Sequence, residues 1–307
     1  MGHVGLGMFG GRVGTVKRQT YDGDTVTVTV RALGNFGIRF LGIDTPEKKI
    51  PLPGEETFTS LSDPRWEMYL ASLFSSDEPA YSAGLTAHLK GLTGGGAASN
   101  HKRIADEAED TLEELIQNDL AEMAVAREDF VFYLRFAFEI MDGYGRLLCF
   151  INRDQPDAGV PSPRPKSYND RMLEAGMASP YFIWPNINPW RTHGSITDAV
   201  FAPGTANDIA VSDSKLREAR EAVKRARAHE KGIFASPDPL RIEPFEIRYL
   251  SKRATPSRWI IDLSRNDGIL IHPENYFTIP HAEDRLFVSA HHVPLFVEAG
   301  WRKQAAP

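Results

Sequence analysis

The chain has 307 residues, of which 42% are hydrophobic and 25% charged, so it can bury one sizeable core and has length for a second small domain. Its 35 Lys and Arg residues against 41 Asp and Glu residues give a net charge of -6. This sign excludes a protein that coats nucleic acid by bulk attraction, because the phosphate backbone is also negative. Any polyanion must therefore be held by a local site.

A single cysteine, Cys149, excludes an internal disulfide framework and a cysteine-rich zinc module. Residues 1–14 lack the charged start and apolar stretch of a secretory signal, and no apolar stretch approaches the length of a membrane span. We therefore expect a cytoplasmic protein that does not enter a membrane.

The first third of the chain has the pattern of strands. Residues 12–30 predict two strands joined by an Asp-Gly turn at 22–23, because threonine and valine alternate from residue 25 onward. A third strand is expected at 36–43, ending before Pro46, which has no amide hydrogen for the sheet. The preceding residues 5–10 match the dinucleotide pattern Gly-x-Gly-x-x-Gly, but they precede a strand and do not open a helix, so we expect a flexible leader.

The later segments have mostly helical patterns, and strands followed by helices are typical of a small barrel with helices packed on it. Residues 238–307, after Pro237, are expected to form a separate small lobe with strand-like runs at 245–250, 259–263 and 268–272. The other expected elements are a helical insertion at about 48–103, an acidic helix at 104–120, strands at 130–140 and 147–152, helices at 168–178 and 213–231, and loops at 153–166 and 187–212.

Three acidic residues follow predicted strands: Asp24, Asp44 and Glu47. If the two strands are neighbours in a barrel, Asp24 and Asp44 converge, and converging carboxylates repel one another unless a hard cation lies between them at about 2.3–2.6 Å. Arg39 and Arg146 offer forked donors that suit a phosphate group. Taken singly, each residue is more typical of a hairpin turn, a strand end or a solvated charge than of a catalytic site.

The order in which these residues and their neighbours occur along the chain is more specific than any one of them. An Asp-Gly-Asp-Thr turn at 22–25 precedes Gly-Ile-Arg-Phe-Leu-Gly-Ile-Asp-Thr-Pro-Glu at 37–47, and Tyr-Gly-Arg follows at 144–146. This ordered set resembles the staphylococcal nuclease (thermonuclease) family, and the resemblance covers most of residues 11–236, with insertions. It implies a mainly β plus α fold with a five-stranded OB-fold barrel and packed helices. The helical insertion departs from the family pattern, and the C-terminal lobe 238–307 lies outside the resemblance.

The resemblance also implies roles for single residues. Asp24 and Asp44 would bind Ca²⁺, Thr45 would offer its backbone carbonyl, and Glu47 would be the general base that activates a water.

Five further residues complete the implied site. Arg39 and Arg146 would neutralise charge on the phosphoryl oxygens, and Tyr144 would hydrogen-bond the phosphate. Phe182 and Trp184 occupy the stretch where the family stacks aromatic rings on the bound base, although core packing explains both rings almost equally well.

The resemblance implies a hydrolase, a Ca²⁺-dependent nuclease that cuts DNA and/or RNA by in-line attack of water and leaves a 3′-phosphate. The alternative is a catalytically silent module that binds nucleic acid or protein, with the insertion plugging the site. A third hypothesis gives the C-terminal lobe a protein partner.

The histidines of the C-terminal lobe invite a zinc hypothesis. Their spacing matches no recognised ligand pattern and no cysteine assists, so surface or capped histidines are expected. The four residues are His272, His281, His291 and His292.

Overall fold

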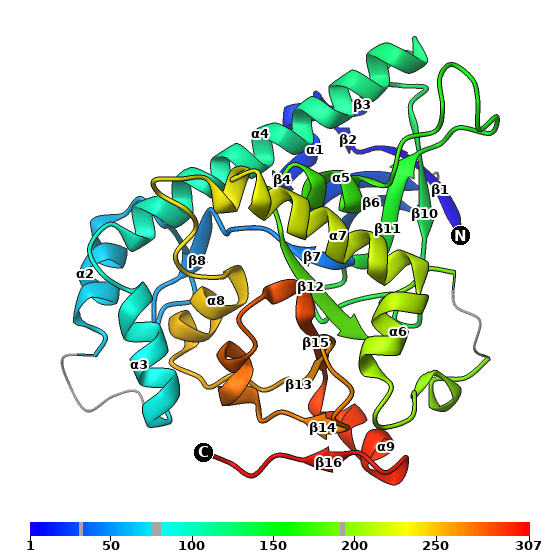
Figure 1. Ribbon diagram of the computed structural model, residues 1–307. Coiled ribbons are helices and arrows are strands. Elements are labelled where there is room, and N and C mark those ends of the chain that lie inside the picture. Colours follow the sequence, from blue (N-terminus) through cyan, green and yellow to red (C-terminus); the bar gives the residue numbers. More distant parts are fainter. Residues whose placement is uncertain (31–32, 75–80, 191–193) are drawn as a thin grey trace.

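The computed structural model describes residues 1–30, 33–74, 81–190 and 194–307 (Figure 1). Its centre is a closed five-stranded barrel, in which the first strand in chain order pairs with both the second and the fourth to close the ring. The third and fifth barrel strands in chain order run parallel, and the other pairs are antiparallel. In chain order the barrel strands are β1 (Gly2–Leu6), β5 (Thr25–Val30), β6 (Gly34–Phe40), β10 (Val131–Arg135) and β11 (Leu147–Arg153). A closed barrel of this size is compatible with the expected OB-type architecture.

The strand predicted from the alternation of threonine and valine is confirmed as β5, and its Val26 and Val28 are fully buried inside the barrel. The Asp-Gly turn is also confirmed: β4 (Thr20–Asp22) pairs with β5, and Asp22 lies opposite Thr25.

The predicted flexible leader is wrong, because residues 2–6 form the barrel strand β1. Val4 and Leu6 of this strand are buried in the core, but the glycines around them weaken the strand pattern in the sequence. The strand expected from residue 12 is interrupted by a short helix, and the elements here are β2 (Met8–Phe9), β3 (Arg12–Val13) and α1 (Val16–Gln19).

Helices cover one side of the barrel. The longest, α4 (Ala97–Met123), crosses the whole upper side of the molecule in Figure 1 and packs on β4 and on α5 (Tyr168–Glu174). Its apolar face, with Ala108, Leu112 and Ile116, is buried in the same core as the barrel interior. α7 (Ser214–Ala228) packs on α5 and on α6 (Ala206–Ser212), so the expected loop at 187–212 contains a helix at its end.

A second sheet joins the C-terminal residues to the rest of the chain. Its strand order is β13 (Trp259–Asp262), β15 (Arg285–Val288), β12 (Ser179–Trp184) and β7 (Gly42–Asp44). Because β15 pairs with β12 and β12 pairs with β7, the segment 238–307 shares a sheet with residues that lead directly out of the barrel.

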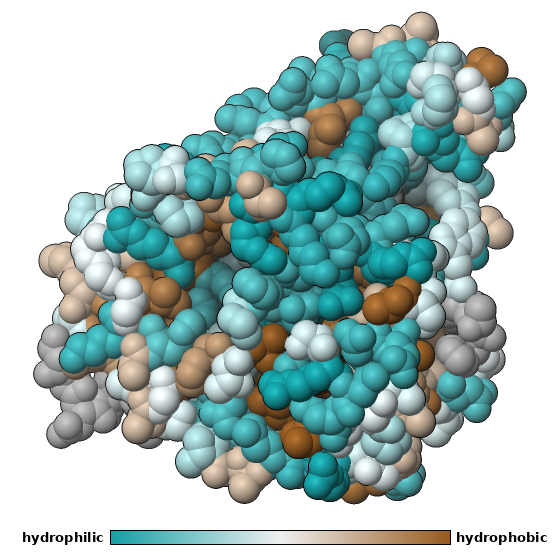
Figure 2. Space-filling model, viewed as in Figure 1, coloured by the Kyte–Doolittle hydropathy of each residue, from teal (hydrophilic) through white to brown (hydrophobic). Residues whose placement is uncertain are grey.

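The insertion and the C-terminal segment share a second core. Buried side chains of the insertion, such as Trp66 and Leu85, lie in one cluster with Phe245, Ile247 and Tyr276 of the C-terminal segment. In Figure 2 apolar residues of this half of the molecule show as recessed brown areas, whereas the surface over α7 is hydrophilic. Two segments far apart in the sequence therefore build one body beside the barrel. Its helices are α2 (Pro64–Ser72), α3 (Ala83–Leu92) and α8 (Pro244–Lys252).

The strand expected at 245–250 is wrong, because these residues lie in helix α8. Pro244 occupies the first turn, and Glu243 and Glu246 form a capping box at its start. The apolar run is too short for its period to separate a helix from a strand.

The remaining elements are short. Residues 75–80 of the insertion and 191–193 of the loop 187–212 lie outside the described part of the chain, and no described helix is long and apolar enough to cross a membrane. The short elements are β8 (Lys49–Pro51), β9 (Phe58–Ser60), β14 (Ile269–Leu270), β16 (Arg302–Lys303), α9 (Val293–Glu298) and the 3-10 turns Thr197–Ala199, Gly232–Phe234, Pro273–Thr278, Ala282–Asp284 and Ala290–His292.

Candidate functional site

The two aspartates predicted to converge do lie together at the end of the barrel. Asp24 follows β4 and Asp44 ends β7, and both are fully buried. One guanidinium joins them: Arg39 on β6 donates from Nη1 to Asp24 and from Nη2 to Asp44. The backbone amide of Thr45 donates to Asp24 Oδ2 at 2.8 Å, which fixes the second oxygen of that carboxylate. Residues from three strand ends thus meet around a single charge cluster.

A second arginine completes the cluster, and it comes from the C-terminal segment. Arg248 on α8 donates from Nη1 and Nη2 to the two oxygens of Asp44, at 2.9 and 2.7 Å. Its Nη1 also donates to Glu47 Oε1 at 2.7 Å. Sequence reasoning missed Arg248, because it lies 201 residues from Glu47 in a segment that matched no motif. No local signal marks it, since an arginine on an amphipathic helix is ordinary.

The charges in this cluster depend on one another. Burial opposes the charge of Arg39, but Asp24 and Asp44 outweigh it and raise the pKa of Arg39. Burial also acts to raise the pKa of Asp44, but Arg248 and Arg39 lower it by more. Burial raises the pKa of Glu47 despite both arginines. The aspartate is therefore held as an anion, whereas the glutamate binds a proton more readily than a free side chain does.

Asp22 is a further carboxylate that sequence reasoning left without a role. It is buried next to the cluster, and burial followed by the charges of Glu47 and Asp24 raises its pKa to about 8. The two arginines thus do not fully balance the carboxylates of this cluster, which repel one another. An additional cation would lower the repulsion between them.

Helix α4, which begins in the insertion and continues beyond it, forms a cover over this site. His101 is fully buried, and its Nε2 accepts the backbone N–H of Glu47 at 2.9 Å, while its Nδ1 lies 3.1 Å from the carbonyl oxygen of Ile242. Burial lowers the pKa of His101 to about 4, so the ring is neutral and Nδ1 carries the proton that it donates. One imidazole therefore ties the turn of Glu47 to the insertion and to the C-terminal segment.

The turn between the two acidic positions touches the same helix. A Cβ placed on Gly23 would lie 2.8 Å from the Cβ of Ala108 on α4. Gly23 is therefore needed for close packing against α4 as well as for the turn.

Arg146 and Tyr144 lie on the turn that leads into β11. Arg146 donates to Asp142 from Nε at 2.8 Å and pairs with it through Nη2 at 2.7 Å, and Tyr144 is 79% exposed. A Cβ on Gly37 would lie 3.1 Å from Arg146 Cγ, so the stem of Arg146 crosses β6 two residues before Arg39. The structure thus places Arg146 beside the strand of Arg39 but pairs it with Asp142.

Phe182 and Trp184 are not available for stacking on a base. Both lie on β12 in the main core, with 3% and 1% of their surface exposed, and the Trp184 indole donates to the carbonyl of Ala199. A buried ring cannot present its face to a ligand, so the substrate-binding prediction is corrected here and core packing explains both residues.

The donor set at the cluster fits a hard divalent cation. The carboxylates of Asp24 and Asp44 and the backbone carbonyl of Thr45 are oxygen ligands, the kind that Ca²⁺ prefers. The hydroxyl of Thr45 is buried and has no hydrogen-bond partner among the described residues. A buried polar atom without a partner is costly unless something occupies the space beside it.

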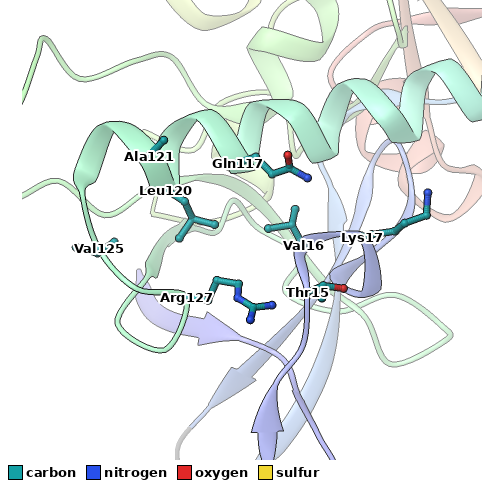
Figure 3. Close-up of a pocket in the computed structure, with 8 residues that line it drawn as sticks. All are labelled: Thr15, Val16, Lys17, Gln117, Leu120, Ala121, Val125 and Arg127. Carbon is teal, nitrogen blue, oxygen red and sulfur yellow. The ribbon is translucent and has the colours of Figure 1, made fainter.

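A hollow of about 480 Å³ lies elsewhere, between α1 and the C-terminal part of α4 (Figure 3). It is open to solvent, and its lining includes Val16, Gln117, Leu120 and Arg127 but none of the clustered carboxylates. This hollow does not contribute to the site.

No protein-family model matches the chain, and no curated protein matches it. The geometry of the site and the resemblance of its motifs are therefore what indicates a function.

Proposed function

We propose that the chain is a Ca²⁺-dependent nuclease of the staphylococcal nuclease type that hydrolyses phosphodiester bonds in DNA and/or RNA. The observation that carries the proposal is the convergence of Asp24, Asp44 and Glu47 around the guanidinium of Arg39. The fold alone would not be sufficient support, because small barrels serve many unrelated functions. The convergence adds the oxygen ligands, the base and the phosphate donor that the motifs imply.

Each residue has a chemical task in this proposal. Asp24, Asp44 and the carbonyl of Thr45 hold the ion, and Ca²⁺ when bound supplies positive charge to a phosphoryl oxygen and a place for water. Glu47 accepts a proton from the attacking water, which its raised pKa favours. Arg39 donates to the phosphoryl oxygens as negative charge develops on them.

Arg146 would act beside Arg39. Its guanidinium sits on an exposed turn, so exchange of Asp142 for a phosphate oxygen requires only a side-chain movement. The products expected are a 3′-phosphate on one fragment and a 5′-hydroxyl on the other.

A catalytically silent binding module is the second candidate, and one observation favours it. Arg248 occupies both oxygens of Asp44, so its guanidinium competes with a metal ion for that carboxylate. The cover formed by α4 also restricts access to the site, because His101 holds the turn of Glu47 in place. In this alternative the chain would bind nucleic acid or a protein partner without cutting.

Digestion of defined substrates separates the two functions. The full chain should fragment single-stranded DNA, duplex DNA or RNA in Ca²⁺, and fragmentation should stop when a chelator removes the ion. The fragments should carry 3′-phosphates. Binding without fragmentation at any Ca²⁺ concentration would support the silent module, and fragmentation that persists in excess chelator would contradict a metal-dependent site.

A further inference from the structure

A second group of metal-binding side chains lies outside the carboxylate cluster. Glu139, His291 and His292 each offer one ligand atom, and these atoms lie within 4.8 Å of one another. Glu139 follows barrel strand β10, whereas the two histidines belong to the 3-10 turn before α9. The group thus joins the barrel to the C-terminal segment.

Glu139 is held in place by a buried amide. Asn186 Oδ1 accepts the backbone N–H groups of Phe138 and Glu139, at 3.0 and 2.9 Å, and its Nδ2 donates to Glu139 Oε2 at 2.6 Å. Asn186 itself is only 3% exposed. A buried partner that orients a ligating carboxylate is the usual outer shell of a metal site, and it lowers the entropy lost when an ion binds.

His292 presents a buried nitrogen that requires a partner. Its side chain packs edge-on against Trp184, with ring centroids 5.0 Å apart, and only 7% of the residue is exposed. Its Nδ1 has no hydrogen-bond partner within the described ranges. Burial, followed by the neighbouring His291, lowers the pKa of His292, so the ring stays in the neutral form that binds metals.

His291 lies at the surface beside this buried ring. The ring centroids of His291 and His292 are 3.9 Å apart, and His291 is exposed, so one member of the group can be reached from solvent. A cluster with one oriented carboxylate, one buried imidazole and one accessible imidazole therefore has the parts of a metal site.

We propose that Glu139, His291 and His292 bind a zinc ion. Two imidazole nitrogens and one carboxylate oxygen are a ligand set typical of Zn²⁺ with a water in the fourth position. Ca²⁺ prefers oxygen ligands alone, so the two sites select different metals. The ion would link the loop after β10 to the turn before α9 and so would fasten the C-terminal segment to the barrel. Sequence spacing missed the group because its carboxylate and its histidines come from distant segments.

Zinc titration of the full chain tests the site. The protein is stripped with chelator, returned to saturating Ca²⁺, and titrated with ZnCl₂ by calorimetry. We expect one equivalent of Zn²⁺ to bind, and we expect Glu139→Gln and His291→Ala to weaken this binding by roughly tenfold or more. His281→Ala is the matched control, because His281 is an exposed histidine of the same segment and should leave binding unchanged.

Three further measurements make the outcome decisive. Asp44→Asn must keep its zinc equivalent, which excludes binding at the carboxylate cluster. Zinc should raise the melting temperature of the wild type by roughly a few degrees and should leave that of His291→Ala unchanged. Because His291 is exposed, its loss should not change folding without zinc. Absence of a saturable equivalent, or equal zinc affinity in the wild type, Glu139→Gln and His291→Ala, would overturn the proposal.

Discussion

Replacing Glu47 with glutamine should lower the rate of Ca²⁺-dependent DNA cleavage roughly a thousandfold, within the range that a positioned general base contributes. The amide keeps an oxygen that can accept from Arg248 and keeps the size of the side chain, but it cannot take a proton from water. The effect should therefore appear in the rate of the chemical step and leave substrate affinity almost unchanged. Single-turnover cleavage with excess enzyme measures that step directly.

The matched control for this variant is Glu56→Gln, a similar change at an exposed glutamate of the same chain. It should cleave at the wild-type rate. Burial raises the pKa of Glu47, so wild-type cleavage should also fall on acidification at a higher pH than the ordinary pKa of 4.5 would give. A Glu47→Gln protein that cleaves as fast as the wild type would remove Glu47 from the mechanism.

Replacing Arg248 with methionine should have opposite effects on stability and on metal binding. Without the guanidinium, the buried Asp44 and the partly buried Glu47 lose a shared partner, and we expect the Ca²⁺-free protein to lose roughly 2–3 kcal/mol of unfolding free energy. The same change removes a competitor for the Asp44 oxygens, so Ca²⁺ should bind about tenfold more tightly, a difference of about 1.4 kcal/mol.

These two effects are linked, because an ion that binds only the folded protein stabilises it. Added Ca²⁺ should therefore recover part of the stability lost in Arg248→Met, as measured by urea unfolding with and without the ion. Lys252→Met, on the exposed side of the same helix, is the matched control and should change neither quantity. If Arg248→Met bound Ca²⁺ no more tightly than the wild type, the competition between arginine and ion would be refuted.

Local sequence patterns predicted part of the barrel and the approach of Asp24 to Arg39. The valines of β5 and the Asp-Gly turn have local patterns, and a turn that pairs β4 with β5 necessarily brings Asp24 to the end of the barrel beside Arg39. The sequence could bring Asp24 and Arg39 together because Asp24 directly precedes β5 and Arg39 lies on β6, and these strands are neighbours both in the chain and in the barrel.

The parts that sequence reasoning missed depend on tertiary packing. Arg248 and His101 reach the site only because the insertion and the C-terminal segment share the second core, and no pattern within either segment indicates that contact. β1 has a weak strand pattern because glycines separate its buried residues. The rings of Phe182 and Trp184 look the same in a sequence whether they face a base or a core.

Binding of Ca²⁺ to the two aspartates is the central claim, and calorimetric titration of the chelator-stripped full chain tests it most directly. We expect one equivalent of Ca²⁺ to bind the wild type and Glu139→Gln, and we expect Asp44→Asn to lose that binding while keeping the wild-type circular dichroism spectrum. No saturable binding to the wild type, or the same affinity in folded Asp44→Asn, would contradict the account.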